Sequence, residues 1–580
     1  MRTSICVVGV VAALLLAIPL ISSPIVGQEL TPKLGGTLVV IQVGDPKSFN
    51  PDAQVDDMGF AMFQNLFNKL VTLDIDYNVI PDLAYKWDVS SDGLTYTFYL
   101  YKNATWHDGV PVTAWDVKWT FETINKSKGI AYSWIKAYNI KSINVIDNYT
   151  VKFVLKQPFA AFLSFLGWYG TFIMPKHIYS NYSDWLDPKN PALQKPVGSG
   201  PFKFVEWVKG DHVTLEANPN YFKGHPYLDK LVFKIIPDAN TALSSFLAGE
   251  GDVLAVRPPF SEIPKLNSTP GVIVKSRAVP SQWYIGFNLL RYPFNDRTLR
   301  LAIAYAINRS YVVEKAMSGY GFPARGGYTS AIKWAFNPNA TLPNYNVTLA
   351  NKLLDDAGYK LGPDGIRRTP NGTKLSIKYT YFTTGPETEA IGVVLKEQLK
   401  KIGIEVTLEG LEIGAWEQKV VKNRDFDIAL CDGFQGPDPD NMRSRFALGA
   451  YLNFANYSNV EYYELLQNAS VTTDFGKRQK LYWKAQEIFV HDLAYIPLVD
   501  LVAFYIWKTE FHGLPWESAG KVNYNSYALT WWEKGKPIEP EYIIFLKNNA
   551  LAIIVVLVVI IGVTITYKVT RKKWSGKNTS

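Results

Sequence analysis

The chain has 580 residues, of which 47% are hydrophobic and 19% are charged, and its formal net charge is +8. Arg2 and five basic residues beyond residue 567 account for most of this charge, so it gives no reason to expect a nucleic-acid partner. Cys6 lies in the N-terminal apolar run, too early to be an acylated lipoprotein cysteine, and Cys431 alone cannot form an intramolecular disulfide. The chain must therefore be held together by core burial, and its length suffices for two or three domains.

Both ends of the chain resemble membrane-directed segments. Residues 1–27 read as a secretory signal, with Arg2 before an apolar run from Ile5 to Leu20. Residues 548–567 carry no charge and would span about 30 Å as a helix, which predicts a transmembrane segment. The basic tail, residues 568–580, favours the cytoplasmic side. We therefore expect a single-pass protein of the cell membrane with the bulk of the chain extracellular.

Two hairpins are predicted in the first half of the chain. Residues 87–101 combine a strand, a Ser-Asp-Gly turn and an alternating strand. Residues 202–221 alternate on both sides of a Lys-Gly-Asp turn. The second hairpin follows the stretch VGSGPF, Val197–Phe202, whose Ser199 has three interpretations: a nucleophile on a sharp turn, part of a phosphate-binding loop, or a feature of the backbone.

The residues around Ser199 favour the backbone interpretation. Val197 stands where a nucleophile elbow has a glycine. Pro201 removes a backbone donor that an oxyanion hole or a phosphate cradle would use. We expect Ser199 to be a polar residue in a tight entry to the hairpin.

The second half of the chain predicts a parallel α/β unit. Residues 375–381 alternate as a strand, a helical stripe follows Gly385-Pro386, and Gly403 ends that helix. Residues 404–410 alternate again, and a helical stretch around Trp416 leads into a third strand, residues 426–432. This order implies a parallel sheet with right-handed crossovers. Upstream, Asn295 or Asp296 caps a helix with Leu299, Ile303 and Ile307 on one stripe. The fold class is α/β.

Ligands of such sheets bind beyond the carboxyl ends of the strands, which places residues 431–441 at the predicted binding edge. The sequence contains no recognisable catalytic motif. Its histidines show no paired spacing of the kind that binds a metal ion. The residues 319–324 match a dinucleotide fingerprint only by accident. Asp438 and Asp440 are candidates for an acid–base pair or a calcium site, although the glycine and distal glutamate of a calcium loop are absent. Trp416, which feeds the third strand, is the best candidate for a flat ligand platform.

Four long blocks resemble the family 5 extracellular solute-binding proteins of the oligopeptide, dipeptide and nickel type, which feed ABC importers. The blocks begin with LAYKWDVSSDGLTYTFYLY, VGSGPFKFVEWVKGDH, YIGFNLLRYPFNDRTLR and RQKLYWKAQEIF, and they occur in the family's order. The C-terminal anchor is similar to that of archaeal members. Some anchored archaeal relatives bind oligosaccharides.

The resemblance implies a two-lobed periplasmic-binding-protein-like fold of type II, with an extra small domain and one C-terminal transmembrane helix. Two lobes would close on a ligand around connecting strands. The expected divisions are a signal peptide (1–27), lobe 1 (28–80, 197–293 and 500–538), the small domain (81–196), lobe 2 (294–499), a juxtamembrane linker (539–547), the transmembrane helix (548–567) and the cytoplasmic tail (568–580).

One position departs from the family pattern. Peptide binders usually capture the ligand's ammonium with an aspartate three residues before the Asp-Pro-Asp segment, and here Gln435 occupies that position. Asp432 or Asp438 could take its place. A neutral amide suits sugar hydroxyls, so the sequence leans towards an oligosaccharide with a ring stacked on Trp416. The expected ligand-binding residues are Trp416, Asp432, Phe434, Gln435 and Asp438.

The sequence thus predicts a non-enzymatic receptor without a cofactor. It would capture oligopeptides or oligosaccharides and deliver them to separate permease and ATPase subunits. The alternative is a surface carbohydrate-active hydrolase that uses Asp438 or Asp440. A structural surface-layer protein, without a ligand or a cleft between lobes, is a third interpretation.

Overall fold

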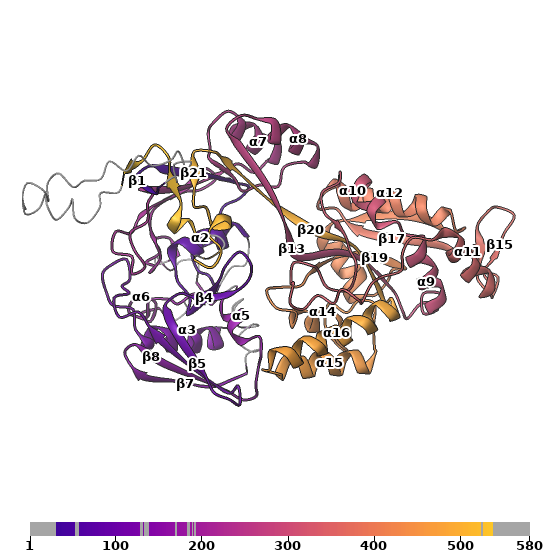
Figure 1. Cartoon of the computed structure of the whole chain (residues 1–580), viewed down its shortest axis with the longest axis horizontal. Coiled ribbons are helices and arrows are strands. Elements are labelled where there is room, and N and C mark those ends of the chain that lie inside the picture. Colours follow the sequence, from indigo (N-terminus) through magenta and orange to yellow (C-terminus); the bar gives the residue numbers. More distant parts are fainter. Residues whose placement is uncertain are drawn as a thin grey trace, which may run out of the picture. The chain divides into compact units, whose positions relative to one another are not determined.

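The computed structural model describes residues 31–52, 57–127, 132, 139–168, 171–182, 186–187, 190, 193–521, 523 and 526–537 (Figure 1). The predicted signal peptide, the linker 539–547, the transmembrane helix 548–567 and the tail 568–580 lie outside them. Within the described ranges, no helix is both long enough and apolar enough to span a bilayer. Leu34–Gly535 form one compact unit, to which the following description applies.

An 11-stranded sheet runs through this unit. Two of its strands are much longer than the others, 16 residues in β13 and 14 residues in β20, and they pair with each other antiparallel. The order of the sheet is β18 (Glu405–Leu411), β17 (Ser376–Phe382), β19 (Ile428–Phe434), β13 (Val272–Phe287), β20 (Tyr495–Lys508), β12 (Val253–Leu254), β2 (Thr37–Gln42), β11 (Lys230–Ile235), β10 (His212–Ala217) and β9 (Phe202–Val208), with β14 (Phe322–Pro323) on β20.

The two long strands connect two separate hydrophobic cores. One core draws on residues 283–499 and the other on residues 38–253 and 507–527. The pairing of β13 with β20 changes register between Ala278 and Gln282, around Pro280. Proline is tolerated in a sheet at such an irregularity because it has no N–H to donate. The molecule therefore has the two predicted lobes, and we call the irregular stretch of β13 between Ala278 and Gln282, with the part of β20 that faces it, the hinge.

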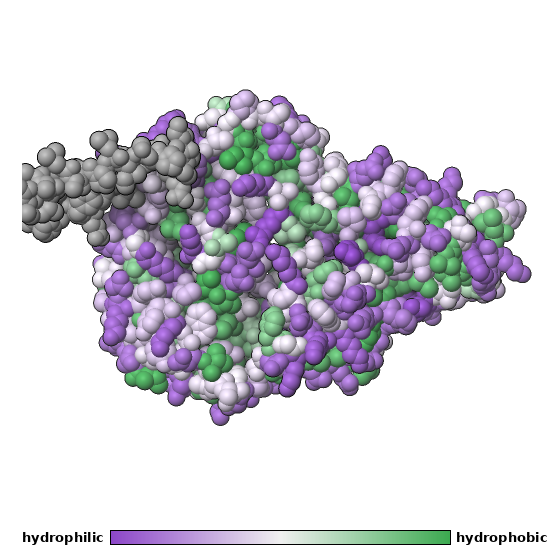
Figure 2. Space-filling view, in the orientation of Figure 1, coloured by the Kyte–Doolittle hydropathy of each residue, from purple (hydrophilic) through white to green (hydrophobic). Residues whose placement is uncertain are grey.

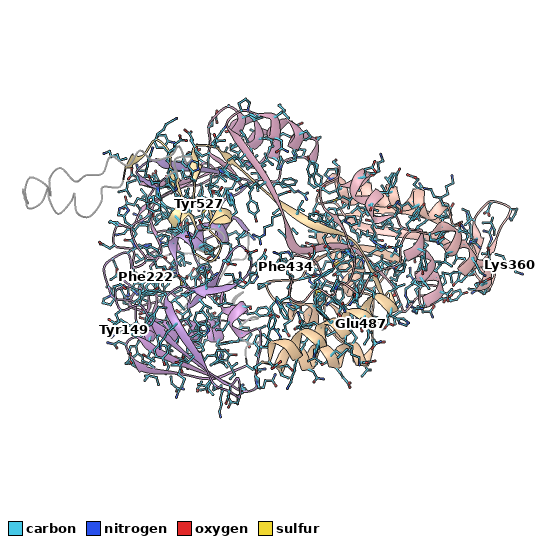
Figure 3. All side chains as sticks on the ribbon, viewed as in Figure 1. Tyr149, Phe222, Lys360, Phe434, Glu487 and Tyr527 are labelled. Atoms are coloured by element: carbon cyan, nitrogen blue, oxygen red, sulfur yellow. The ribbon has the colours of Figure 1, made fainter. Side chains whose placement is uncertain are left out.

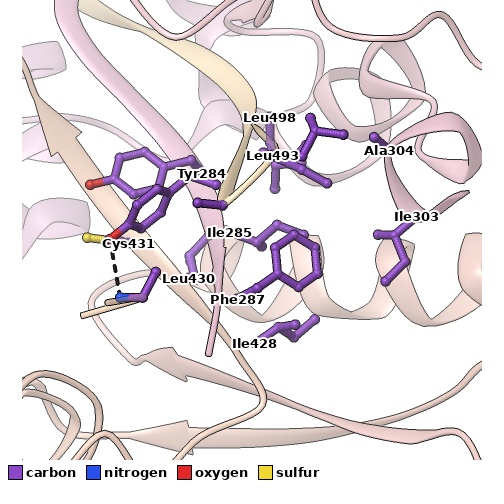
Figure 4. Close-up of a cluster of buried hydrophobic side chains, with 14 of the residues drawn as sticks. Tyr284, Ile285, Phe287, Ile303, Ala304, Ile428, Leu430, Cys431, Leu493 and Leu498 are labelled. Atoms are coloured by element: carbon purple, nitrogen blue, oxygen red, sulfur yellow. Dashed lines mark hydrogen bonds between the residues drawn. The ribbon is translucent and has the colours of Figure 1, made fainter. Parts of the chain in front are cut away.

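The core of lobe 2 forms where β13 and β19 lie side by side and helices cover them (Figure 4). Ile285 and Phe287 of β13 pack beside Ile428 and Leu430 of β19, all of them buried. The covering helices are α9 (Arg297–Ala306), α10 (Arg309–Ala316), α11 (Val347–Asp356), α12 (Pro386–Lys400), α13 (Ile413–Trp416), the π-helical turn η3 (Glu417–Lys422), α14 (Asn441–Phe446), α15 (Val460–Val471) and α16 (Phe475–Asp492).

The predicted parallel unit of lobe 2 is confirmed. β17 pairs in parallel with both β18 and β19, and α12 forms the crossover between β17 and β18. Gly403, between the end of α12 and the start of β18, has the left-handed conformation, with a φ of +71°. Of the two capping candidates before α9, Asp296 is the cap, since its carboxylate accepts a hydrogen bond of 2.8 Å from the Thr298 N–H.

Both predicted hairpins are present in the other part of the unit. β5 (Ala84–Val89) pairs antiparallel with β6 (Thr95–Leu100), and β9 pairs antiparallel with β10. β5 and β6 continue into a four-stranded sheet with β8 (Thr150–Leu155) and β7 (Ile140–Asp147). The helix α3 (Ala114–Ser127) covers this sheet, because its apolar stripe is buried there. The predicted boundaries of the small domain at 81 and 196 stay predictions.

The remaining elements are short. They are β1 (Lys33–Leu34), α2 (Asp57–Leu66), β3 (Val71–Leu73), β4 (Val79–Pro81), α5 (Phe162–Leu166), α6 (Lys176–Tyr179), α7 (Ala239–Leu247), η2 (Phe260–Glu262), α8 (Ile263–Ser268), β15 (Lys360–Leu361), β16 (Arg367–Arg368), β21 (Phe511–His512), η4 (Pro515–Glu517), η5 (Tyr527–Leu529), β22 (Trp531–Trp532) and β23 (Lys536–Pro537). On the face drawn in Figure 2, hydrophobic residues occur in small groups separated by hydrophilic ones.

The VGSGPF stretch is a backbone feature, as predicted. A Cβ on Gly198 would lie 1.7 Å from the carbonyl oxygen of Leu66, so the chain passes too close for any side chain. The His107 ring holds both glycines, because Nδ1 accepts from the Gly198 N–H and Nε2 donates to the Gly200 carbonyl, each over 3.1 Å. Ser199 is fully buried, and its hydroxyl donates to Asn68 over 3.1 Å.

Candidate ligand-binding site

The predicted binding edge lies beside the hinge. β19 runs antiparallel to β13, with Asp432 opposite Trp283 and Phe434 opposite Ser281. Ser281 belongs to the irregular stretch in which β13 passes from one lobe to the other. The carboxyl end of β19 is therefore at the crossing point between the lobes, where a ligand held by both would lie.

Phe434 makes an aromatic contact with the other lobe. Its ring, labelled in Figure 3, stacks on Trp168 with centroids 5.6 Å apart and planes inclined by 21°. Trp168 follows α5 and also contacts Tyr77, in the turn between β3 and β4, with centroids 6.0 Å apart. No pattern in the sequence singles out Trp168 or Tyr77, because neither belongs to a motif and both are far from Phe434 along the chain.

Gln435 is fully engaged by protein groups. The residue is 1% exposed. Its Oε1 accepts from the Thr329 N–H over 2.7 Å, and its Nε2 donates to Gln282 over 2.8 Å and to the Gly327 carbonyl over 3.1 Å. Its backbone N–H donates to Pro280 over 2.6 Å. Gln435 therefore connects the 326–330 loop to the hinge by hydrogen bonds. Its contact with a ligand stays a prediction.

The Gln435 network ends at a buried carboxylate. The Nε2 of Gln282 donates a hydrogen bond of 2.6 Å to one carboxylate oxygen of Asp500. Ser330 donates to the other oxygen from its N–H (3.3 Å) and from its hydroxyl (3.2 Å). Asp500 is 3% exposed and makes no ion pair with any described residue. This burial raises the pKa of its carboxyl to about 6. No motif in the sequence marks Asp500, which stands alone in an apolar strand.

The carboxylate of Asp438 forms a buried salt bridge with Arg478. Arg478 donates to both of its carboxylate oxygens, over 2.8 and 2.6 Å, and Asp438 also accepts from the Asp440 N–H over 2.9 Å. Asp440 pairs with Arg443 over 3.1 Å. Both carboxylates are buried and paired with guanidinium groups, and of the Asp440 oxygens only Oδ2 takes part in its pair. Across the described part of the chain, no group of three or more ligating side chains could hold a metal ion.

Asp432 is the accessible carboxylate of the predicted set. Its side chain is exposed, one oxygen accepts from the Ser281 hydroxyl over 2.6 Å, and it makes no ion pair with a described residue. Desolvation by surrounding protein atoms nevertheless raises the pKa of its carboxyl. Asp432 is thus the one carboxylate among the predicted residues that is exposed and not paired with a cation of the described part of the chain.

Trp416 lies in the core of lobe 2. The residue is 7% exposed, and its ring meets Phe382 and Phe454 edge to face, with centroids 5.5 and 6.0 Å apart. Such packing leaves little ring surface for a sugar. The placement favours a core role, and stacking on a ligand stays a prediction.

Cavities lie between lobe 2 and the rest of the compact unit at more than one place. The hinge pocket, of about 410 Å³, lies between Tyr77 and the hinge segment Lys275–Ala278, with Lys333 of lobe 2 on its wall. A second cavity, of about 540 Å³, lies between Phe165 and the α14–α15 region. The stacked rings of Trp168 and Phe434 likewise join the two lobes. These features define a binding protein with a cleft between two hinged lobes.

Comparison with known proteins gives the family. Residues 78–453 match the bacterial extracellular solute-binding proteins, family 5 Middle, and the chain belongs to this family. It is 33% identical over 477 residues to the oligopeptide-binding protein AppA of Bacillus subtilis, covering 80% of this chain and 86% of AppA.

Two solved structures are similar along nearly the whole fold. AppA from Bacillus subtilis in complex with a nonapeptide has a TM-score of 0.70 at 30% identity, over 87% of this chain and 100% of that one. The ABC transporter substrate-binding protein CtaP from Listeria monocytogenes has a TM-score of 0.77 at 27% identity, over 87% and 100% of the two chains. They support the two-lobed fold.

Proposed function

We propose that this protein is the extracellular receptor of an ABC importer and that it captures peptides between its two lobes. The observation that carries the proposal is the similarity to AppA, whose solved structure holds a nonapeptide, along both lobes. In this proposal the peptide lies between the lobes, beside the carboxyl end of β19. The bound receptor would pass its ligand to separate permease and ATPase subunits.

Asp432 is the proposed partner of the ligand's ammonium. Gln435 stands at the position where peptide binders of the family have the aspartate that binds the ammonium. Its side-chain amide is hydrogen-bonded to protein groups at both its oxygen and its nitrogen. Asp438 is neutralised by Arg478. Asp432 keeps an exposed side chain beside the hinge, and a carboxylate desolvated by surrounding protein binds an ammonium more strongly than one in bulk water does.

Capture would close the lobes about the hinge. β13 and β20 cross between the cores at an irregular register, which allows rotation without breaking the regular pairing on either side. A ligand that contacts both lobes binds the closed form better than the open one and so shifts the population towards closure. The predicted segment 548–567 would keep the receptor at the membrane, close to its permease.

The experiment is calorimetry of the full chain in detergent against a mixed tripeptide and pentapeptide pool and against cello-oligosaccharides. We expect binding of peptides, with compaction in small-angle scattering. Binding of the sugars alone would overturn the peptide proposal and restore the oligosaccharide prediction. Turnover of the sugars would instead favour the hydrolase alternative.

A further inference from the structure

A cavity of about 390 Å³ lies inside lobe 2, and all of its lining residues belong to the stretch 307–345. We call it the lobe 2 cavity. Three short segments enclose it: the start of α10, the chain from β14 to Arg325, and the loop 341–345. Of the described residues, none from β13 or β19 lines it. The lobe 2 cavity is therefore separate from the cleft between the lobes.

Two arginines give the lobe 2 cavity its charge. Arg309 and Arg325 both line it, and the lining contains no aspartate or glutamate of the part of the chain that the structure describes. Neither arginine makes an ion pair with a described residue. The cavity therefore holds two positive charges that no carboxylate in its lining balances.

Arg309 is partly buried, and its charge is not compensated. Its Nη2 donates to the Pro343 carbonyl oxygen over 2.8 Å, whereas its Nη1 is buried and has no hydrogen-bond partner among the described residues. Burial lowers the pKa of the Arg309 guanidinium to about 10, and no carboxylate offsets this effect. Buried charges are normally paired, because an unpaired one is costly. An anion in the cavity would lower that cost.

The start of α10 adds to the positive potential. Arg309 is the first residue of this helix, at the end where the aligned peptide dipoles give a partial positive charge. The cap residue, Asn308, accepts a hydrogen bond of 3.1 Å from the Tyr311 N–H, which satisfies only one of the N–H groups of the first turn. A cation at this end of a helix is disfavoured, and an anion is favoured. The helix end and the guanidinium therefore favour the same ligand charge.

The loop 341–345 holds the two arginines in place. The Leu342 N–H donates to the Arg325 carbonyl oxygen over 2.8 Å, and the next residue of the loop, Pro343, accepts from Arg309. Adjacent loop residues thus bind both arginines, although these are 16 positions apart along the chain. The two positive charges are brought to one cavity by the fold, before any ligand binds.

We propose that the lobe 2 cavity binds a phosphate group, with Arg309 and Arg325 as its cationic partners. Two guanidinium charges match a phosphate dianion, and the forked geometry of each guanidinium suits two oxygens of one phosphate. A carboxylate would balance only one of the two charges. The volume of about 390 Å³ leaves room for a small organic substituent, so both free phosphate and a phosphate monoester fit this chemistry. The inference does not depend on the proposed function, because it requires no peptide in the cleft.

The test is calorimetry of the full chain in detergent with three probes: inorganic phosphate, glycerol 3-phosphate and acetate. The main variant is Arg325→Gln, at an exposed side chain. Arg309→Lys is the second variant, which keeps the charge and loses the fork. Lys360→Gln is the control, since Lys360, labelled in Figure 3, is an exposed cation of lobe 2 that makes no ion pair with a described residue and does not line the cavity.

We expect both phosphates to bind the wild type at millimolar concentration or below, and acetate to bind about tenfold more weakly or not at all. Arg325→Gln should weaken both phosphates by about tenfold, and Arg309→Lys should weaken them as well, whereas Lys360→Gln should change neither. If Arg309→Lys does not fold, Arg325→Gln decides. Tighter binding of glycerol 3-phosphate would assign the site to phosphate monoesters, and tighter binding of inorganic phosphate would assign it to the free ion.

Three results would overturn the inference: no binding of either phosphate, equal affinity for acetate and phosphate, or an equal loss of phosphate binding in Lys360→Gln. Peptide affinity should be the same in Arg325→Gln and in the wild type. A parallel loss of peptide and phosphate binding in Arg325→Gln would show that the two ligands share one site, and a separate phosphate site would then be wrong.

Discussion

The ring of Phe434, at the end of β19 in lobe 2, stacks on the ring of Trp168, which belongs to the other lobe, with centroids 5.6 Å apart. An offset or stacked aromatic pair adds about 0.5–1.5 kcal/mol beyond its buried area. Because the pair joins the lobes, this energy belongs to the arrangement in which they touch. The contact therefore links the predicted binding edge to closure of the cleft.

Phe434→Leu is expected to weaken peptide binding about two- to tenfold, since leucine keeps an apolar side chain but loses the ring contact. The loss should appear as faster dissociation, with little change in the melting temperature. The control is Phe475→Leu, which removes a ring contact with Trp334 inside lobe 2. An equal effect of both variants on binding would show that the Phe434 contact has no special part in closure.

Gln435→Ala is expected to destabilise the protein. The substitution leaves the Thr329 N–H and the side-chain Oε1 of Gln282 buried without their partner. An unsatisfied buried polar group costs about 1–3 kcal/mol, so the unfolding free energy should fall by that amount in denaturant titrations. Gln418→Ala, at an exposed glutamine, should stay within about 0.5 kcal/mol of the wild type. An unchanged unfolding free energy in Gln435→Ala would mean that these hydrogen bonds do not stabilise the 326–330 loop.

Asp500 and His107 should give opposite slopes of stability against pH. Burial raises the pKa of Asp500 to about 6, so the folded state binds a proton more readily and stability falls as the pH rises from about 4 to about 6. Burial lowers the pKa of His107 to about 4, so its contribution is full above about pH 6.5 and is lost as the pH falls towards 4. The two slopes oppose each other in the wild type.

Single variants separate the two slopes. Relative to the wild type, Asp500→Asn should gain up to about 3 kcal/mol of unfolding free energy between pH 4 and pH 7, because burial raises the pKa of the Asp500 carboxyl to about 6. His107→Gln should lose the fall in stability below pH 6.5. Denaturant titrations at four pH values would measure both. A difference between wild type and Asp500→Asn that does not change with pH would contradict the raised pKa.

Sequence patterns predicted the strands and helices of lobe 2 well, because each strand or helix depends on residues that are close together in the chain. The alternation of residues 375–381, the stripe of α12 and the glycine at 403 together define the parallel unit, and the binding edge at the end of β19 follows from it. The partners of that edge could not be predicted. Gln282 and Asp500 are 218 residues apart, and only the pairing of β13 with β20 brings them together.

The same distinction applies to single residues. Gln435 stands out by comparison with the family pattern, but its four hydrogen bonds come from the hinge and the 326–330 loop, whose positions no local pattern reveals.

Gly198→Ala should prevent normal folding. The new Cβ would lie 1.7 Å from the Leu66 carbonyl oxygen, and a backbone group cannot move aside as a flexible side chain can. We expect a loss of soluble protein or a large drop in melting temperature. Gly476→Ala is the control, because its Cβ would meet only an Asp474 oxygen at 3.7 Å and alanine suits a helix better than glycine. A well-folded Gly198→Ala protein would contradict the close approach.

Asp432 and Asp438 offer the sharpest separation of binding from stability. Asp432→Asn keeps the shape of an exposed side chain and its bond to Ser281 but removes the charge. Peptide affinity should fall by roughly tenfold or more, because a charged hydrogen bond contributes about 1.5–3 kcal/mol. The unfolding free energy should hardly change.

Asp438→Asn should do the reverse. The substitution leaves Arg478 buried without its counter-charge, and breaking such a pair costs about 3–5 kcal/mol. The protein should unfold at much lower denaturant concentration, while the folded fraction keeps its affinity for N-acetylated and free peptides in the same ratio as the wild type. Asp432→Asn alone should abolish that discrimination, since acetylation removes the charge that Asp432 recognises. If Asp438→Asn loses the discrimination instead, the ammonium is bound at Asp438 and the assignment to Asp432 is wrong.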